Sequence, residues 1–454
     1  MDIGICGTFD VANYGDLLFP LIAESELRER LGGLTLHRFS YHSKAPPDWP
    51  YEVHSVEALP HIIHRLDGLL IGGGFVIRFD KEVAPGYAPP SSEIHHPTGY
   101  WLTPALLALQ HNVPVMWNAP GMDGNDIPLW ARPLMELVLT HSRYVSMRDQ
   151  PSRAKLDPLT SAAIAVVPDT AFGLPRLLHL DAAPSAEFLS LSEASGLDRP
   201  YLVVQATRGL EGFVRFLRNH AERFRNFRFL ALPMGPALGD SPEILDADLP
   251  GLVRLARWPS PLVIAELIAR SEAVAGYSYH LMITALAAGV PVFTGQNLSE
   301  GKYSAFQRFE SISLLPSNGE PDLEWFLARV GRTTPSAGVR ATGEPLAQHW
   351  DRITAELRAG PSTTAPQLDR FWQSLPALLE DATRRESEAV AALAKQRAEA
   401  HDRFEDAMAQ LAEARTGTAA RDARIAEILA SISWKLTAPL RFAGRHLRKP
   451  GGGK

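Results

Sequence analysis

One histidine, His280, stands at the start of a run of small and apolar residues within the stretch GYSYHLMITALAAGVP, residues 276–291. Histidine is the usual proton-transfer side chain near neutral pH. The start of a helix presents free backbone N–H groups to an anion and disfavours the imidazolium form. His280 is therefore predicted either to transfer a proton beside a bound anion, or to cap and pack the helix without any chemistry.

Charged side chains follow other strand-like runs. Arg148 and Asp149 come directly after YVSM, Asp169 follows AVVP, and Arg208 follows VVQAT in the second half of the chain. A planar guanidinium binds carboxylate or phosphate through two parallel hydrogen bonds. These residues predict an anion-binding site. The alternative is that they form ion pairs within the fold.

Two glycine-containing loops, NYGD and IGGG, also follow apolar runs. After a buried strand, such loops offer backbone N–H groups to an anion, and glycine lets a ligand approach closely. Both loops equally fit a structural turn or the close packing of a strand end. The dinucleotide spacing G-x-G-x-x-G is absent. The candidate binding residues in these loops are Asn13, Gly15, Asp16, Gly72, Gly73 and Gly74.

No metal or other cofactor is expected. The sequence contains no HExxH motif, and the pair His95–His96 alone does not make a metal site. The formal net charge of -6 gives no reason to expect a nucleic-acid partner. Cys6 is the only cysteine, which excludes an intrachain disulfide and favours a cytoplasmic location. We expect no signal peptide, and no apolar run reaches the 18 or more residues that a membrane span needs.

These residues depend on the elements that position them, and short apolar runs alternate with amphipathic helical patterns along the chain. This alternation predicts two α/β, doubly wound, Rossmann-like domains, residues 1–185 and 198–376, in a GT-B-type arrangement. The Ser-, Ala- and Pro-rich segment 176–199 is expected to link them. Ligands of such sheets bind outside the carboxyl ends of the strands, so the candidate residues should face a cleft between the domains.

The remaining sequence differs in composition. Residues 377–430 predict a long helix or coiled coil, and hence either self-association to a homo-oligomer or a single exposed helix. The basic tail 431–454 holds six Lys or Arg and no acid, which predicts contact with a membrane surface, or else a docking peptide. The helical pattern rests on Val390, Leu393, Ala400, Phe404, Ala407, Leu411 and Ala414, interrupted by Arg397. The tail combines Trp434, Leu440, Phe442 and Leu447 with Arg441, Arg445, Arg448 and Lys449.

The chain resembles the polysaccharide pyruvyltransferase family, because five motifs occur in the family's order over roughly residues 3–295. These motifs are NYGD, IGGG, SMRD, VVPD and HLMITALAAGVPV. The resemblance implies two Rossmann-like halves and transfer of a pyruvyl group from phosphoenolpyruvate to sugar hydroxyls of bacterial surface polymers. It places the family histidine at His280 and the family Arg-Asp pair at Arg148 and Asp149. Ser278 stands where the family has an arginine that the resemblance implies for donor binding, and Tyr279 replaces the usual leucine.

Residues and resemblance together predict a pyruvyltransferase-like enzyme whose partners are phosphoenolpyruvate and a glycan or lipid-linked sugar acceptor. Arg148 and Arg208 are expected to bind the anionic donor in place of the arginine missing at Ser278. The alternatives are a GT-B glycosyltransferase using a nucleotide sugar and a catalytically silent assembly protein. The segment SWKLTAPLRFAGRHLRK resembles the end of bacterial surface-polysaccharide glycosyltransferases, which implies a location at the inner face of the membrane.

Overall fold

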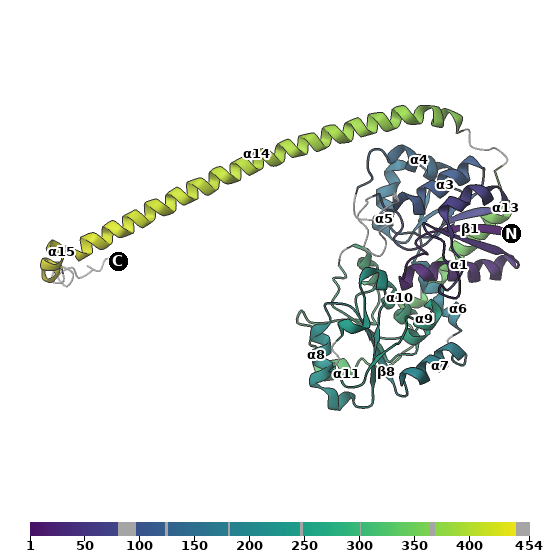
Figure 1. Ribbon diagram of the computed structural model, residues 1–454, viewed down its shortest axis with the longest axis horizontal. Coiled ribbons are helices and arrows are strands. Elements are labelled where there is room, and N and C mark those ends of the chain that lie inside the picture. The colour runs from purple at the N-terminus through teal and green to yellow at the C-terminus, as the bar shows by residue number, and fades with distance from the viewer. Residues whose placement is uncertain are drawn as a thin grey trace, which may run out of the picture. The chain divides into compact units, whose positions relative to one another are not determined.

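The computed structural model describes residues 1–79, 97–122, 126–179, 182–245, 248–299, 301–362 and 368–441. The chain divides into two compact units, Met1–Leu378 and Leu379–Lys454. In the described residues the first unit contains three parallel sheets. The sheets of β1 to β5 and of β6 and β7 form what we call the first half, and the sheet of β8 to β13 forms the second half (Figure 1).

In the first half the strands lie in the order β3-β2-β1-β4-β5, all parallel. β6 and β7 pair with each other, and a parallel bridge from Met116 to Tyr144 joins them to β5. Leu69, Leu70 and Ile71 are successive residues of β4 that alternate between the two faces, and all three are fully buried, as expected for strands covered on both faces. The strands are β1 (Asp2–Cys6), β2 (Thr35–Ser40), β3 (His54–Ser55), β4 (Gly68–Ile71), β5 (Val115–Trp117), β6 (Val145–Met147) and β7 (Ile164–Val166).

The second half repeats this plan with the parallel order β10-β9-β8-β11-β12-β13. Its strands are β8 (Tyr201–Gln205), β9 (Arg228–Leu232), β10 (Leu252–Arg254), β11 (Ala273–Ala275), β12 (Val292–Thr294) and β13 (Ile312–Leu314). The observed fold is therefore the α/β, doubly wound pair that the sequence pattern predicts.

Helices connect and cover the strands. They are α1 (Tyr14–Leu31), α2 (Leu59–Ile62), α3 (Leu102–Gln110), α4 (Arg132–His141), α5 (Gln150–Leu156), α6 (Leu174–Leu178), α7 (Ala186–Ser195), α8 (Glu211–Asn219), α9 (Pro261–Ala269), α10 (Tyr279–Ala287), α11 (Leu323–Leu327), α12 (Ala337–Arg340), α13 (Gly343–Ala359), α14 (Asp369–Ala430) and α15 (Ile432–Leu436). Two 3-10 helices, η6 (Thr170–Gly173) and η10 (Gly301–Phe306), contribute to the site described below.

The two halves share one hydrophobic core, in which α1 of the first half packs against α9 and α10 of the second (Figure 1). Polar contacts fix the same junction. The hydroxyl of Tyr14 lies 2.8 Å from Thr284 Oγ1, and the backbone N–H of Tyr14 donates to the carbonyl of Met234 at 2.9 Å. The start of α1 is therefore held against the carboxyl end of β9.

Two segments differ from their sequence interpretation. The predicted linker 176–199 contains a formed helix, α7, because the hydroxyl of Ser185 caps it and Gly196 ends it in a left-handed conformation. The helix α13 lies within the range predicted for the second domain, yet it packs against α1, and its Leu357 lies against Gly68 of β4. An amphipathic pattern shows which face of a helix is buried but not which sheet receives it.

The second unit consists of the helix α14 from residue 379 onward, with α15 and the end of the chain. Beyond Ala382, which is buried, this unit exposes large apolar side chains; Val390, Phe404 and Ile425, for example, are 62%, 60% and 54% exposed. None of the helices in the described ranges is both long and apolar enough to span a membrane. The predicted tail from Phe442 onward lies outside the described residues.

Candidate functional site

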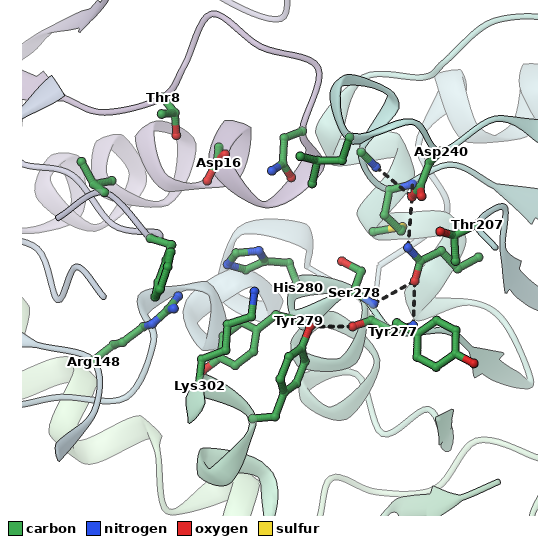
Figure 2. A pocket seen from close by; sticks show the side chains of 18 of the residues that line it. Thr8, Asp16, Arg148, Thr207, Asp240, Tyr277, Ser278, Tyr279, His280 and Lys302 are labelled. Atoms are coloured by element: carbon green, nitrogen blue, oxygen red, sulfur yellow. Dashed lines mark hydrogen bonds between the residues drawn. The ribbon is translucent and has the colours of Figure 1, made fainter. Parts of the chain in front are cut away.

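A pocket of about 420 Å³ opens where the carboxyl ends of the sheets of the two halves face each other (Figure 2). We call it the interdomain pocket. Loops after β1, β4 and β6 line it from the first half, and loops after β8, β9, β11 and β12 line it from the second. Its lining includes Thr8, Asn13, Asp16, Phe75, Arg148, Gln205, Asp240, Ser278, Tyr279, His280 and Lys302. The site therefore lies where open α/β sheets usually bind ligands.

His280, Asp169 and Arg148 meet beside this pocket, although they come from three different strand ends. His280 is the second residue of α10, and its Nε2 lies 3.8 Å from Asp169 Oδ2. Arg148 Nη1 donates to the same carboxylate oxygen at 3.3 Å. The other oxygen of Asp169 accepts a hydrogen bond from the backbone N–H of Ala171 at 3.0 Å and so begins η6. Asp169 is thus fixed by the backbone and faces both Arg148 and His280.

The Asp169 carboxylate is buried, and burial alone raises the pKa of a carboxyl. Contact with His280 and the charge of Arg148 outweigh that effect and hold the pKa of Asp169 below its usual value. A carboxylate that stays ionised beside an imidazole orients the ring and stabilises its protonated form.

The position of the His280 side chain depends on Gly15 of the NYGD loop. A Cβ atom at Gly15 would lie 1.8 Å from Nδ1 of His280. The imidazole also packs edge-on against Phe19 of α1, with ring centres 5.4 Å apart. The side chain of His280 is only 12% exposed, so it is a packed residue as well as a pocket residue. Gly15 makes room for the histidine of the opposite half.

The glycines of IGGG have a packing role. A Cβ atom at Gly72 would lie 2.6 Å from the carbonyl oxygen of Cys6, and one at Gly73 would lie 2.2 Å from the Phe19 ring. Gly74 has a φ of +85°. None of these three glycines lines the interdomain pocket, whereas the next residue, Phe75, does. The glycines thus allow the loop to pack closely against Cys6 and Phe19, and the residue after them, Phe75, lines the pocket.

Arg148 is the buried cation of the pocket. Its side chain is 1% exposed and lies between the rings of Phe75 and Tyr279, at 5.2 and 4.8 Å from the ring centres. Its Nε lies 3.5 Å from Asp149 Oδ2 and so pairs with a second carboxylate, whereas its Nη2 has no hydrogen-bond partner among the described residues. A buried guanidinium with unused donors beside a pocket is suited to an anionic ligand.

Lys302, at the start of η10, supplies a second cation that the sequence analysis missed. Its Nζ lies 5.7, 5.8 and 5.2 Å from the ring centres of Phe75, Tyr279 and Tyr303. Burial, together with the charge of Arg148, lowers the pKa of Lys302 to about 8. The only signal in the sequence is its place beyond the strand VPVFTG, in a loop without a charged motif.

The other candidates from the NYGD and SYH motifs reach the pocket to different degrees. Asn13 and Asp16 line it. Ser278 also lines it, and its hydroxyl caps α10 by accepting from the N–H of Leu281 at 3.5 Å. Three strand-end candidates do not line it, and one of them is Asp169, which lies beside it in contact with Arg148. Asp149 caps α5, accepting from the N–H of Ser152 at 2.7 Å, and Arg208 is an exposed residue.

A polar network fixes the second-half wall of the pocket (Figure 2). The Gln205 side-chain oxygen accepts hydrogen bonds from the N–H groups of Tyr277 and Ser278 at 2.7 and 2.8 Å. Its amide nitrogen donates to Asp240 at 3.0 Å, and the same Asp240 oxygen accepts from the N–H of Gly235 at 3.1 Å. The loop that leads into His280 is therefore held rigidly in place.

Within the described ranges, no group of three or more His, Cys, Asp or Glu side chains is placed to hold a metal ion. His95 and His96 lie outside these ranges. The charged side chains that line the pocket are Asp16, Arg78, Arg148, Asp240 and Lys302, and the carboxylate of Asp169 lies beside it, in contact with Arg148.

Comparison with solved structures agrees with the fold. The UDP-GlcNAc 2-epimerase of Methanocaldococcus jannaschii has a TM-score of 0.51 at 12% identity, covering 79% of this chain and 100% of that chain. The UDP-GlcNAc 2-epimerase of Neisseria meningitidis has a TM-score of 0.49 at 13% identity, with 79% and 100% covered. The fold shared with the Methanocaldococcus jannaschii enzyme is of the GT-B type, and this is the architecture of the first unit.

No curated protein matches the chain in sequence. A family model does match, over residues 13–294, and its description is polysaccharide pyruvyl transferase. The matched range contains the NYGD loop, Arg148, Asp169 and His280, and it ends before Lys302. The chain therefore belongs to the polysaccharide pyruvyl transferase family.

Proposed function

We propose that this protein transfers the pyruvyl group of phosphoenolpyruvate to hydroxyls of a bacterial surface saccharide. The observation that carries the proposal is the cationic wall of the interdomain pocket, where the unused donors of Arg148 and the ammonium group of Lys302 lie beside His280. Phosphoenolpyruvate carries a phosphate and a carboxylate on the same carbon, C2, and each needs a cation in a buried site. Lys302, instead of Arg208, is the second cation that binds the donor and replaces the arginine missing at Ser278.

The reaction needs one proton delivered and one removed. His280 gives a proton to the methylene carbon of the donor, which makes the neighbouring C2 electrophilic, and an acceptor hydroxyl adds to C2. Phosphate then leaves C2, and a second hydroxyl adds to complete the ketal. One hydroxyl proton restores His280 and the other departs with the phosphate. Asp169, 3.8 Å from Nε2, stabilises the protonated ring before the transfer.

Release of inorganic phosphate from phosphoenolpyruvate in the presence of bacterial surface saccharides tests this function. His280→Gln, which keeps a side chain at the packed position, should lower the rate by about 10²–10⁴-fold, the usual contribution of a positioned general acid. His141→Ala, at an exposed position at the end of α4, is the matched control and should keep the wild-type rate. An unchanged rate in His280→Gln, or thermal stabilisation by a nucleoside diphosphate but not by phosphoenolpyruvate, would overturn the assignment.

We also propose that the protein works at a membrane surface, where lipid-linked acceptors would be found. The support comes from the basic tail after Ser431 and from exposed apolar side chains next to it, such as Ile432 and Leu440, which are 77% and 74% exposed. Each basic side chain near an anionic surface contributes about 1 kcal/mol. The full chain should float with anionic liposomes, and a chain ending at residue 430 should not. Equal flotation of both would exclude this role.

A further inference from the structure

A second pocket, of about 580 Å³, shares no lining residue with the interdomain pocket. We call it the tryptophan pocket. It combines a loop of the first half, one face of α7, and the segment between β10 and α9 of the second half. Its volume is within the range of about 300–1,000 Å³ that is typical of ligand sites. The residues used below are Asp48, Trp49, Glu187, Ser190, Ala194, Arg257 and Trp258.

Both tryptophans are half-buried and their indole N–H groups are already used. Trp49 donates to the backbone carbonyl of Phe9 at 2.8 Å, and Trp258 donates to that of Pro233 at 2.9 Å. These bonds hold the two rings in fixed positions in the wall of the pocket. What the rings offer to a ligand is consequently an apolar surface and not a hydrogen-bond donor.

Hydroxyl and charged groups surround the two indole rings. From α7, Glu187, Ser190 and Ala194 point to the pocket at the spacing of one helix face. Asp48 comes from the first half and Arg257 from the second, and both are exposed. Carboxylates and hydroxyls accept hydrogen bonds from ligand hydroxyls, and the guanidinium donates to ring and hydroxyl oxygens.

The residues that accept the indole hydrogen bonds are adjacent in sequence to lining residues of the interdomain pocket. Phe9, which holds Trp49, follows Thr8, and Pro233, which holds Trp258, precedes Met234. Thr8 and Met234 both line the interdomain pocket. The two tryptophans are thus hydrogen-bonded to the same two strand-end loops, one from each half, that contribute to the interdomain pocket.

We infer that the tryptophan pocket binds sugar residues of the acceptor glycan beyond those that react, an inference that rests on the proposed function. A pyranose ring presents apolar C–H groups on its faces and hydroxyls around its edge, which is the combination that fixed indole rings among carboxylates and hydroxyls accommodate. A proline-rich peptide also stacks on aromatic rings, but it lacks the hydroxyls that these charged side chains would bind.

The experiment measures binding directly, without phosphoenolpyruvate, so that its outcome does not depend on catalysis. Saccharides of one to six residues, prepared from bacterial surface polymers, are titrated against the full chain by calorimetry and by saturation-transfer NMR. Ala194→Trp fills the pocket from an exposed position on α7 and leaves the core untouched. Leu189→Trp, also exposed on α7 but outside the pocket, is the matched control.

We expect the longer saccharides to bind about tenfold more tightly than single sugars, and this gain to disappear in Ala194→Trp and in Trp258→Ala but not in Leu189→Trp. Equal affinity of short and long saccharides for the wild type, or an unchanged gain in Ala194→Trp, would overturn the inference. Preferential binding of a proline-rich peptide would overturn it as well. If the saccharides bind as expected but no phosphate is released in the transfer assay, the proposed function fails while the binding site stands.

Discussion

At the scale of single residues, the ring of His280 has room for its position because its neighbour Gly15 has no Cβ atom. Gly15 lies so close to the imidazole that even a methyl group would overlap Nδ1. Gly15→Ala should therefore push the ring away from Asp169 and lower the transfer rate at least tenfold, at a stability cost of about 1–3 kcal/mol. The rate of phosphate release and the urea midpoint measure both effects.

Gly33→Ala is the control for this change, because nothing lies within 4 Å of a Cβ atom at Gly33. It should alter neither the rate nor the midpoint by a comparable amount. A Gly15→Ala protein with the wild-type rate would show that the imidazole position seen here is not needed for turnover.

The pKa of Lys302 gives the donor site a pH dependence. Because burial lowers this pKa to about 8, the ammonium group is charged below pH 8 and loses its charge as the pH rises through that value. The affinity for phosphoenolpyruvate should fall over the same interval. In Lys302→Arg the charge persists, so the alkaline loss should disappear. Calorimetric titrations between pH 6.5 and 9.5 compare the two proteins, and an identical loss in both would exclude Lys302 as its source.

Part of this site could be predicted from the sequence. Arg148, Asp169 and His280 each lie within five residues of the end of an apolar strand. Parallel strands bring their carboxyl ends together, so the proximity of these residues follows from the pattern. Lys302 lies further from the end of its strand, and its position over the Phe75 ring depends on the placement of η10. Arg208 has the expected spacing but is exposed, because a strand-end position does not determine the direction of a long side chain.

At the scale of elements, the short apolar strands were predictable, whereas the docking of α13 was not. His349 of α13 is buried in the first half, with its Nε2 3.1 Å from Asn118 Oδ1 and its Nδ1 3.0 Å from the hydroxyl of Tyr144. These polar partners are far from His349 in the sequence, so no local pattern identifies them. The same is true of Gly68, whose missing side chain leaves room for Leu357.

The burial of His349 makes the docking of α13 sensitive to acid. Burial, aided by the charge of Arg30, lowers the pKa of His349 to about 3, while in the unfolded chain it is about 6.5. Between these values the unfolded state binds more protons. The free energy of unfolding should therefore decrease as the pH falls below 6.5, by about 1.4 kcal/mol per pH unit from this residue.

His349→Gln should remove this contribution, since glutamine does not titrate, while it lowers stability at neutral pH by about 1–3 kcal/mol through weaker hydrogen bonding. Urea unfolding at several pH values between 4 and 7 provides the comparison. Parallel pH curves for the wild type and the variant would show that His349 does not cause the acid sensitivity.

At the scale of the whole molecule, the site and the long helix are separate parts of the chain. All the residues of the interdomain pocket belong to the unit Met1–Leu378, and none belongs to the unit Leu379–Lys454. Changes on the helix beyond residue 378 should therefore affect association without affecting the chemistry. This separation makes the function of the second unit testable by itself.

The helix carries an apolar row that the described chain leaves exposed. Val390, Phe404, Leu411 and Ile425 recur at multiples of seven residues, and they are 62%, 60%, 45% and 54% exposed. Leu393, Ala400, Ala407, Ala414 and Ile428 follow the same register three residues later. A seven-residue repeat with two apolar positions is typical of coiled coils, in which such a row is buried against another helix.

We therefore expect two or more copies of the chain to associate through this row. Phe404→Glu with Leu411→Glu places charges within the seam, where burial without a partner is unfavourable, and should give a monomer. Ala409→Glu, on the opposite side of the helix, is the control and should leave the oligomer intact. Light scattering after gel filtration measures the mass of each protein, and a monomeric wild type would contradict the expectation. Because the site lies wholly in the first unit, the dissociated variant should keep its rate of phosphate release per chain, and a loss of that rate would show that the helix also supports the site.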